Sequence, residues 1–526
     1  MTFDATTPWP PIPDAVRSPM AGWSAWYEGT PEALATYYAF GYGSAQSRPR
    51  VRPSQFAGGI VGALARFWWG QPQTSGQPAK GLHVPLAADI ASASADMLFS
   101  EELGLDFGKT PEAASKRLLE VLDANSWQAL LPEASEVQAA LGGVYLRAGW
   151  DTSIADHPLL SVVHADHAVP EFRFDRLSAV TLWEVLRQDG QEVWRHLERH
   201  EPGRIIHEVR QGSLNTLGRP IPLTEFPETA DIKLDGDNFI ETGAKGLAVE
   251  YVPNVRPSRR WRNEPAGRSL GRADIDGTEP LLDALDETWT SLLRDVRHGK
   301  SRIIAASSML TNQGVGQGAT VDLDREVFES VTFSQGENAK LGDLISAQQF
   351  SIRVDEHLRT CAGLMGSIVR GAGYSGQSFG LDTDVAKTAT EVSSVRDRTR
   401  QTREKKTRYW TAALERFLPT IGEIDKHVFG KGGRVEVDVD FPADATTSLE
   451  TTARSLQMLR AARAISTETA VALAQPGWSE DQVAEEVARI LAEESASVVN
   501  VVDPFTPDQG TSLRMPEAQA AKLEQP

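Results

Sequence analysis

A glycine-rich segment is the first place in the chain where residue types and spacing suggest chemistry. Residues 371–376 read GAGYSG, which matches the pattern G-x-G-x-x-G of dinucleotide-binding turns. That pattern holds a pyrophosphate only where a strand precedes it and a helix follows it in a βαβ unit. Here an amphipathic helix precedes the glycines, with Val354, Leu358, Cys361, Met365 and Ile368 in line. We therefore expect a mobile loop rather than a nucleotide site.

Two histidine-containing stretches are the next candidates, because imidazoles bind metal ions. The first stretch contains His157, His164, His167, Asp156 and Asp166. Its spacing matches no established metal site. The second stretch, HLERH at 196–200, places two histidines one helical turn apart but lacks the glutamate directly after the first histidine that zinc proteases use. We expect ordinary turn and surface histidines in the first stretch, and no metal site in either.

Other catalytic motifs are absent from the sequence. It contains no G-x-x-x-x-G-K-[ST] phosphate loop and no G-x-S-x-G nucleophile turn. Cys361 is the single cysteine, which excludes disulfide frameworks and cysteine zinc sites and fits synthesis in a reducing cytosol. We therefore predict no catalytic residue, no cofactor and no enzyme activity. The alternative is an enzyme with an unrecognised nucleotide or metal site in a body at 85–250.

A long charged helix follows the glycine segment. Neither glycine nor proline interrupts the chain from Val385 to Leu418, and Pro419 is expected to end the helix. Its last third has an apolar seam that must be buried, formed by Trp410, Leu414, Phe417 and Ile421. No large apolar residue lies between Arg396 and Arg408, so we expect that part to be a solvated spine joining two bodies.

The basic residues of this spine allow two interpretations. Arg396, Arg400 and Arg403 are candidates for contacts with phosphate groups. The other interpretation is a solvated face that pairs with acidic residues of a neighbouring subunit.

Composition limits the classes of function. The 526 residues are 40% hydrophobic and 24% charged, which fits a globular protein of several units. The net charge of −19 argues against a protein that grips nucleic acid over its whole surface, but not against one that lets DNA pass without sticking. No apolar run is long enough to span a membrane. The N-terminus has no secretory signal pattern.

Several segments, in their order along the chain, resemble the portal protein family of tailed bacteriophages, in particular that of siphophages of actinobacteria. The segments are HVPLAADIASASADMLFSEEL, RSLGRADIDGTEPLLDALDETWTSLLRDVRHGKSRI, GQSFGLDTDVAKTATEVSSVRDRTRQTREKKTRYWTAAL and ISTETAVALAQPGWSEDQVAEEVARILAEE. The resemblance extends over roughly residues 20–498.

The resemblance implies an α+β portal fold that assembles into a ring. Two amphipathic helices around an irregular segment fit the two stem helices and the clip of that family. The expected parts are an N-terminal arm (1–50), an α/β wing (51–270), a first stem helix (271–299), a clip (300–342), a second stem helix (343–370), a tunnel loop (371–386), the spine helix with the rest of the wing (387–460), a helical crown (461–499) and a disordered tail (500–526).

The resemblance also implies function and partners. We expect a ring of twelve subunits at one capsid vertex of the virion, assembled in the host cytoplasm, through which double-stranded DNA is packaged and ejected. Implied partners are other copies of the chain, the terminase large subunit, a head-tail adaptor, and the major capsid and scaffolding proteins, without a membrane. Another virion component, such as a capsid or minor head protein, is a further alternative.

The resemblance assigns roles to two sets of residues. The DNA-facing residues of the tunnel loop would be Gly371, Gly373, Tyr374, Gln377, Ser378 and Phe379. The contacts between neighbouring stems would be Leu285, Trp289, Leu292, Leu358 and Met365.

Overall fold

The computed structural model describes residues 4–39, 82–236, 238–298, 302–305, 311–312, 319–320, 345–348, 353–381, 389–442, 449–475 and 478–499. Contacts divide the chain into two compact units, Met1–Pro442 and Ala443–Pro526. The second unit begins before helix α13 (Leu449–Ala461).

The described N-terminal part of the first unit, up to Leu141, is mainly helical. Its helices are α1 (Asp14–Glu28), α2 (Pro31–Ala39), α5 (Leu86–Phe99), α6 (Glu112–Ala124) and α7 (Trp127–Leu141). Trp23 and Trp26 of α1 are buried in the core of this unit, and the Trp23 ring packs against that of Trp261. The described part of the expected arm therefore belongs to the first unit, because its aromatic side chains are buried there.

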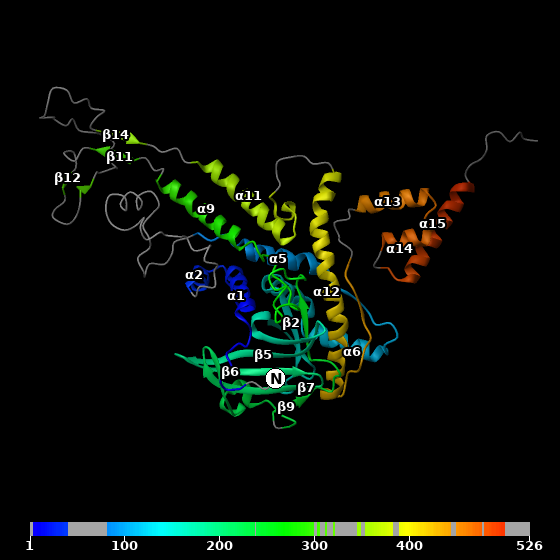
Figure 1. Cartoon of the computed structure of the whole chain (residues 1–526). Coiled ribbons are helices and arrows are strands. Elements are labelled where there is room, and N and C mark those ends of the chain that lie inside the picture. Colours follow the sequence, from blue (N-terminus) through cyan, green and yellow to red (C-terminus); the bar gives the residue numbers. More distant parts are fainter. Residues whose placement is uncertain are drawn as a thin grey trace, which may run out of the picture. The chain divides into compact units, whose positions relative to one another are not determined.

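Two antiparallel sheets follow (Figure 1). The larger has the order β4-β5-β6-β7-β8, from β4 (Ala168–Arg173), β5 (Arg176–Asp189), β6 (Glu192–Glu201), β7 (Arg204–Ser213) and β8 (Thr216–Ile221), and β9 (Phe239–Glu241) also pairs with β7. The smaller has the order β10-β2-β3, from β10 (Val249–Pro253), β2 (Gly143–Gly149) and β3 (Leu159–His164). The chain is thus a mixed helix-and-sheet protein, as the sequence predicted.

The two helices expected as stems lie side by side (Figure 1). They are α9 (Glu279–His298) and α11 (Val354–Ala372), and His357 Nε2 is 3.0 Å from Asp295 Oδ2 across the pair. Between them, strand β11 (Arg302–Ala305) pairs with β14 (Ile345–Gln348), and β12 (Thr311–Asn312) pairs with β13 (Ala319–Thr320). The rest of the expected clip lies outside the described residues.

Helix α12 (Ala389–Phe429) packs within the first unit and does not end at Pro419. A proline inside a helix costs about 3 kcal/mol. Ile421 and Ile424 are both fully buried beyond it, and each buried side chain of this size returns about 2 kcal/mol. Continued burial therefore offsets the proline, which is why the expected stop is wrong. Beyond α12, β15 (Asp438–Asp440) pairs with β1 (Gly104–Asp106).

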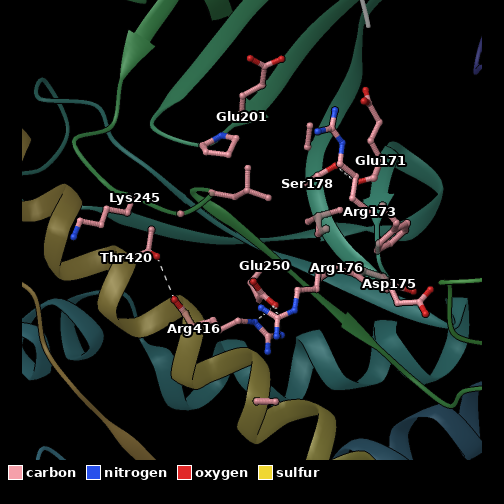
Figure 2. A pocket seen from close by; sticks show the side chains of 18 of the residues that line it. Glu171, Arg173, Asp175, Arg176, Ser178, Glu201, Lys245, Glu250, Arg416 and Thr420 are labelled. Carbon is pink, nitrogen blue, oxygen red and sulfur yellow. Dashed lines mark hydrogen bonds and ion pairs between the residues drawn. The ribbon is translucent and has the colours of Figure 1, made fainter.

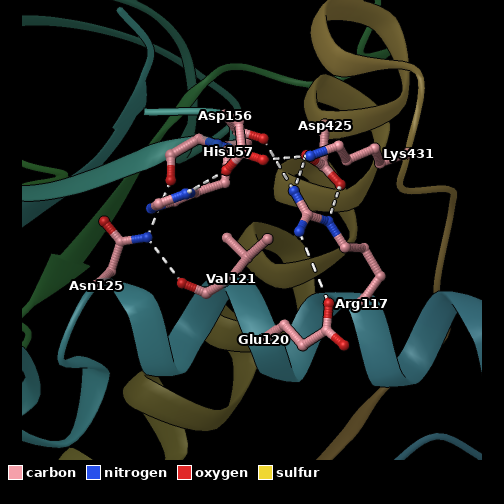
Figure 3. Close-up of polar contacts among 9 residues, drawn as sticks. Arg117, Glu120, Val121, Asn125, Asp156, His157, Asp425 and Lys431 are labelled. Atoms are coloured by element: carbon pink, nitrogen blue, oxygen red, sulfur yellow. Dashed lines mark hydrogen bonds and ion pairs between the residues drawn. The ribbon is translucent and has the colours of Figure 1, made fainter. Parts of the chain in front are cut away.

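A cluster of charges joins the end of α12 to α6 (Figure 3). The carboxylate of Asp425 is almost fully buried and accepts hydrogen bonds from Arg117 Nε at 2.9 Å and from a terminal guanidinium nitrogen at 3.1 Å. Lys431, just beyond the helix, pairs with Asp156 of the turn before β3. These contacts fix the helix end against the body of the unit.

Replacing Arg117 by methionine is expected to lower the free energy of unfolding by about 3 kcal/mol, because the buried Asp425 carboxylate loses its charged partner. Denaturant unfolding of the purified protein measures the change. Arg353→Met is the matched control, since the Arg353–Glu356 pair is exposed and the expected change is below about 0.5 kcal/mol. Equal effects of the two variants would show that the pair with Asp425 has no special role.

The second unit consists of three helices in its described part. They are α13, α14 (Thr467–Ala474) and α15 (Glu480–Val499), and Ser466 caps α14 by accepting a hydrogen bond from the Thr469 N–H. Several of its large apolar side chains are exposed, namely Met458, Leu459, Leu473, Trp478 and Leu491. None of the helices in the described residues of either unit is long and apolar enough to cross a membrane.

Candidate functional site

Helix α11 ends in a glycine turn that is tied to α12. Gly373 caps the helix at φ +100°, and its N–H donates to the carbonyl of Arg370 at 3.1 Å. Thr402 of α12 donates its hydroxyl to the Gly373 carbonyl at 2.7 Å, and the N–H of Ser375 donates to the hydroxyl of Thr399 at 2.9 Å. The start of the expected tunnel loop is therefore held against the long helix rather than free.

The expected DNA-facing residues divide into an exposed and a buried group. Gly371 and Ser378 are exposed, whereas Gln377 and Phe379, in the 3-10 turn η4 (Gly376–Phe379), are half-buried. Tyr374 is 1% exposed, so a contact between its side chain and DNA is ruled out in this conformation. Residues 382–386 of the expected loop lie outside the described residues.

The burial of Tyr374 is explained by a polar cluster beneath the turn. The ammonium group of Lys406 donates to Asp274 Oδ2 at 2.7 Å, Ser94 Oγ at 2.6 Å and the Tyr374 hydroxyl at 3.0 Å. The Tyr374 hydroxyl itself donates to Asp274 Oδ2 at 2.6 Å, and Asn254 Nδ2 donates to Asp274 Oδ1 at 2.7 Å. Lys406 and Asp274 together thus join the turn, α12, α5 and the segment before α9.

Lys406 corrects the expectation that the middle of α12 is solvated on all sides. Its side chain is 0% exposed, and Thr402, one turn earlier, is also buried. Burial lowers the pKa of Lys406, while the charge and hydrogen bond of Asp274 oppose that shift. Because an unpaired buried charge is very unfavourable, Lys406 and Asp274 stabilise the turn only as a pair.

Gly373→Ala is expected to destabilise the protein by about 2 kcal/mol. Alanine at this position would have to adopt the positive φ of Gly373, which strains its backbone. Its Cβ would lie 2.8 Å from Thr402 Oγ1 and would displace the hydroxyl that donates to the carbonyl of residue 373. Gly380→Ala is the control with about half of this cost, since φ there is +66° and a Cβ meets no atom within 4 Å. Thermal and denaturant unfolding compare the two. A larger cost at Gly380 would contradict the role given to Thr402.

The candidate basic contacts have different surroundings. Arg403 donates to the backbone carbonyls of Met97 at 2.9 Å and Pro442 at 2.7 Å, so it acts as a structural clamp. Arg400 is about half exposed and lies 3.9 Å from Glu404 one turn on. The side chain of Arg396 lies outside the described residues.

The candidate stem contacts are also divided. The side chains of Leu285 and Leu292 are 0% and 6% exposed, so both are buried within this chain. Neither therefore offers a surface to a neighbouring subunit. Trp289 and Met365 are partly buried against the same core. Leu358 is 44% exposed. The amphipathic spacing indicated buried side chains at Leu285 and Leu292, and their burial within this chain does not fit the stem contact that the resemblance implied for them.

A charged cleft of about 1140 Å³ lies between the larger sheet and α12 (Figure 2). Arg416 of α12 reaches across it to Glu250 of β10, with Nε 2.9 Å from Oε1. On the sheet side, Arg199 pairs with Glu171 at 2.6 Å and Glu201 at 2.9 Å. These charges already neutralise one another, so the cleft has a lining of ion pairs rather than a convergent catalytic set.

The family model for phage portal proteins of the SPP1 Gp6-like type matches residues 72–499. This match covers most of the chain, including both expected stem helices and all of α12. The chain belongs to the SPP1 Gp6-like phage portal family.

Solved structures similar to this portal protein come from gene transfer agent (GTA) particles. One is the virion of the native particle, with 13% identity over 74% of this chain and 89% of that chain and a TM-score of 0.41. Another is the neck of the native particle computed with C12 symmetry, with the same identity and coverage and a TM-score of 0.39. A third is the neck of the empty particle computed with C6 symmetry, with 13% identity over 74% and 90% of the two chains and a TM-score of 0.38. No curated protein matches the chain.

Membership in a structural, non-enzymatic family leaves the enzyme alternative without support. The nucleotide pattern at 371–376 begins in α11 and continues into a 3-10 turn, so the strand that dinucleotide binding requires is replaced by a helix. The portal protein is thus a virion and head-tail connector component.

The histidines of the two stretches have different surroundings. His196 and His200 are on strand β6 of the portal protein, and both are buried. His196 Nε2 is 3.1 Å from His207 Nδ1, and His200 Nε2 is 2.7 Å from Glu198 Oε1. The other stretch divides: Asp156 and His157 join the cluster of Figure 3, and His164, Asp166 and His167 form a separate group.

Sequence reasoning missed the cluster around Lys406, although α12 carried a signal for it. Positions 402 and 406 precede Trp410 at intervals of four residues and continue the helical phase of the buried seam. A lysine on that line has to find an acidic partner. The partner, Asp274, is 132 residues away in sequence, so periodicity alone does not identify it.

Proposed function

We propose that twelve copies of this portal protein form a ring at one capsid vertex and that double-stranded DNA passes through its channel during packaging and ejection. The family match over residues 72–499 is the observation that carries the proposal. The ring would be assembled in the host cytoplasm and would bind the terminase large subunit, a head-tail adaptor, and the major capsid and scaffolding proteins.

Charge supports passage of DNA without tight binding. Twelve chains of −19 each carry about −230, and like charges repel the phosphate backbone. A polyanion in an acidic channel gains little from the release of counterions, so it can slide. Exposed basic residues such as Arg400 can still centre the duplex by weak, screened attraction.

The turn after α11 is the element that we assign to the channel wall. Its outer residue Ser378 is exposed, with Gln377 beside it, while Tyr374 and Lys406 hold its root in the core. This division between a fixed root and an exposed outer end suits a loop that touches moving DNA without unfolding.

Neighbouring copies are expected to meet along the stem pair. Leu358 and Val354 of α11 and Val296 of α9 are 38–44% exposed, although each is apolar. Exposed apolar side chains on a helix pair mark a surface that gains free energy when a partner covers it. We assign that partner to a second copy of the chain, with the core of each stem pair kept inside its own subunit.

The double variant Gln377→Glu/Ser378→Glu tests the channel assignment. It adds two negative charges per chain at the turn, 24 in a ring of twelve, and should leave ring mass unchanged while DNA packaging into capsids falls at least tenfold. Gln188→Glu/Gln191→Glu is the matched control, because it adds the same charge on the β5–β6 hairpin. Normal packaging by the turn variant, or an equal loss in the control, would reject the assignment.

A further inference from the structure

The crossover between the two sheets brings three metal-binding side chains together. β3 ends at His164, the 3-10 turn η1 (Ala165–His167) follows, and β4 starts at Ala168. His164, Asp166 and His167 each offer one ligand atom, and these atoms lie within 4.8 Å of one another. Their separation in sequence gave no recognised motif, but the tight turn places them on one side of the crossover.

The geometry of this group is close to that of a coordination sphere. His167 Nδ1 is 3.1 Å from Asp166 Oδ1, and the two imidazole rings have centroids 6.3 Å apart. Ligands bound to Zn²⁺ at about 2.1 Å in tetrahedral geometry lie about 3.4 Å from one another. The distance from the His167 nitrogen to the Asp166 oxygen is already near this length, and the exposed ring of His164 lies beside that of His167.

The backbone that carries the three ligands is held in place. Ala165 and Ala168, on either side of the turn, are buried in the core of the first unit. The ring of His167 packs on that of Trp183 at 5.0 Å, which restricts its orientation. A rigid support of this kind reduces the entropy that ligands lose on binding a cation.

We propose that His164, Asp166 and His167 bind a divalent transition-metal ion of the Zn²⁺ class at the crossover between the two sheets. A donor set of two imidazoles and one carboxylate suits Zn²⁺, Co²⁺ and Ni²⁺. It does not suit Mg²⁺ or Ca²⁺, which bind oxygen ligands. Three protein ligands leave at least one position to water. Because the ligands join the end of β3 to the start of β4, the bound ion stabilises the crossover.

Metal titration of the untagged full-length protein tests this site. After treatment with a chelator and exchange into metal-free buffer, Zn²⁺ is titrated by calorimetry, and Co²⁺ is followed by its visible absorption. We expect one equivalent per chain and an increase in the thermal unfolding midpoint with Zn²⁺. Each of His164→Ala, Asp166→Asn and His167→Ala should weaken binding at least about tenfold and remove the increase.

His157→Ala is the matched control. His157 also lies beside an aspartate, Asp156, at 3.4 Å, but it belongs to the cluster of Figure 3 and not to the three ligands. Its loss should leave Zn²⁺ affinity unchanged, and the metal-free unfolding midpoint of each variant shows whether the fold is intact. The proposal is overturned if the wild-type protein shows no saturable binding, if the three variants retain wild-type affinity, or if His157→Ala weakens binding equally.

Discussion

Replacing Lys406 by methionine is expected to lower the free energy of unfolding by about 3–5 kcal/mol, because Asp274 would be left as a buried charge without its cationic partner. Asp274 would retain Asn254 and Tyr374 as donors, but neutral donors do not balance its charge. Denaturant unfolding of the full chain measures the loss. Proteolysis within 371–381 gives a local measure, since the turn loses the group that holds Tyr374.

A double variant and a neighbouring lysine separate charge from packing at this site. Lys406→Met/Asp274→Asn should recover at least half of the loss, because no unpaired charge remains buried. Lys405→Met should change stability by less than about 0.5 kcal/mol, since Lys405 is exposed on the other side of α12. If the double variant is no more stable than Lys406→Met, the ion pair is not the reason for the stability of the turn.

Stability is expected to fall by about 3 kcal/mol between pH 7 and pH 4 through a single buried histidine, His207. Burial lowers the pKa of His207 to about 4; the attraction of Glu198 opposes this shift, and the repelling charges of His196, His200 and Arg147 add to it. The unfolded chain therefore binds this proton below about pH 6.5, whereas the folded chain binds it only near pH 4. The contribution is fully present above pH 6.5 and is lost as pH falls toward 4.

Neighbouring groups act in the same direction. Burial raises the pKa of Glu198, but the charges and hydrogen bonds of Arg147 and His200 outweigh it and hold that pKa well below its usual range. Its contribution is lost only as pH falls below about 4.5. His196, 3.1 Å from His207, also lies 3.0 Å from Glu184. The loss between pH 6.5 and 4.5 thus belongs mainly to His207.

Unfolding midpoints in denaturant at pH 7.0, 6.0 and 5.0 measure this dependence. His207→Gln keeps a neutral group beside His196 and should flatten the slope between pH 6.5 and 5. His157→Gln is the control and should keep the wild-type slope. A wild-type slope in His207→Gln would mean that another group takes up the proton.

The sequence predicted the long helix, the buried seam and the mixed fold because these depend on local periodicity. Trp410, Leu414, Phe417 and Ile421 are all buried, as their spacing indicated. The end of the helix was wrong, since burial of Ile424 beyond Pro419 depends on the rest of the fold. Local pattern identifies a buried face but does not say how far tertiary packing extends it.

The candidate site was predictable only in part, for a related reason. The position of the glycine turn followed from the sequence, whereas Tyr374 turned out to be buried because Lys406 and Asp274 bind its hydroxyl. Likewise, Leu285 and Leu292 carry the amphipathic pattern of an interface, but their partners are in the same chain. Apolar periodicity does not distinguish a contact within a subunit from one between subunits.

The mass and symmetry of the purified protein test the central claim most directly. Mass photometry with averaged negative-stain images should show a ring with a central hole and a mass near 690 kDa, which is twelve chains of 57.4 kDa. Such a ring is the result that a portal channel requires. A particle of one or two chains without a hole, also after co-expression with the scaffolding and capsid proteins, would contradict the account.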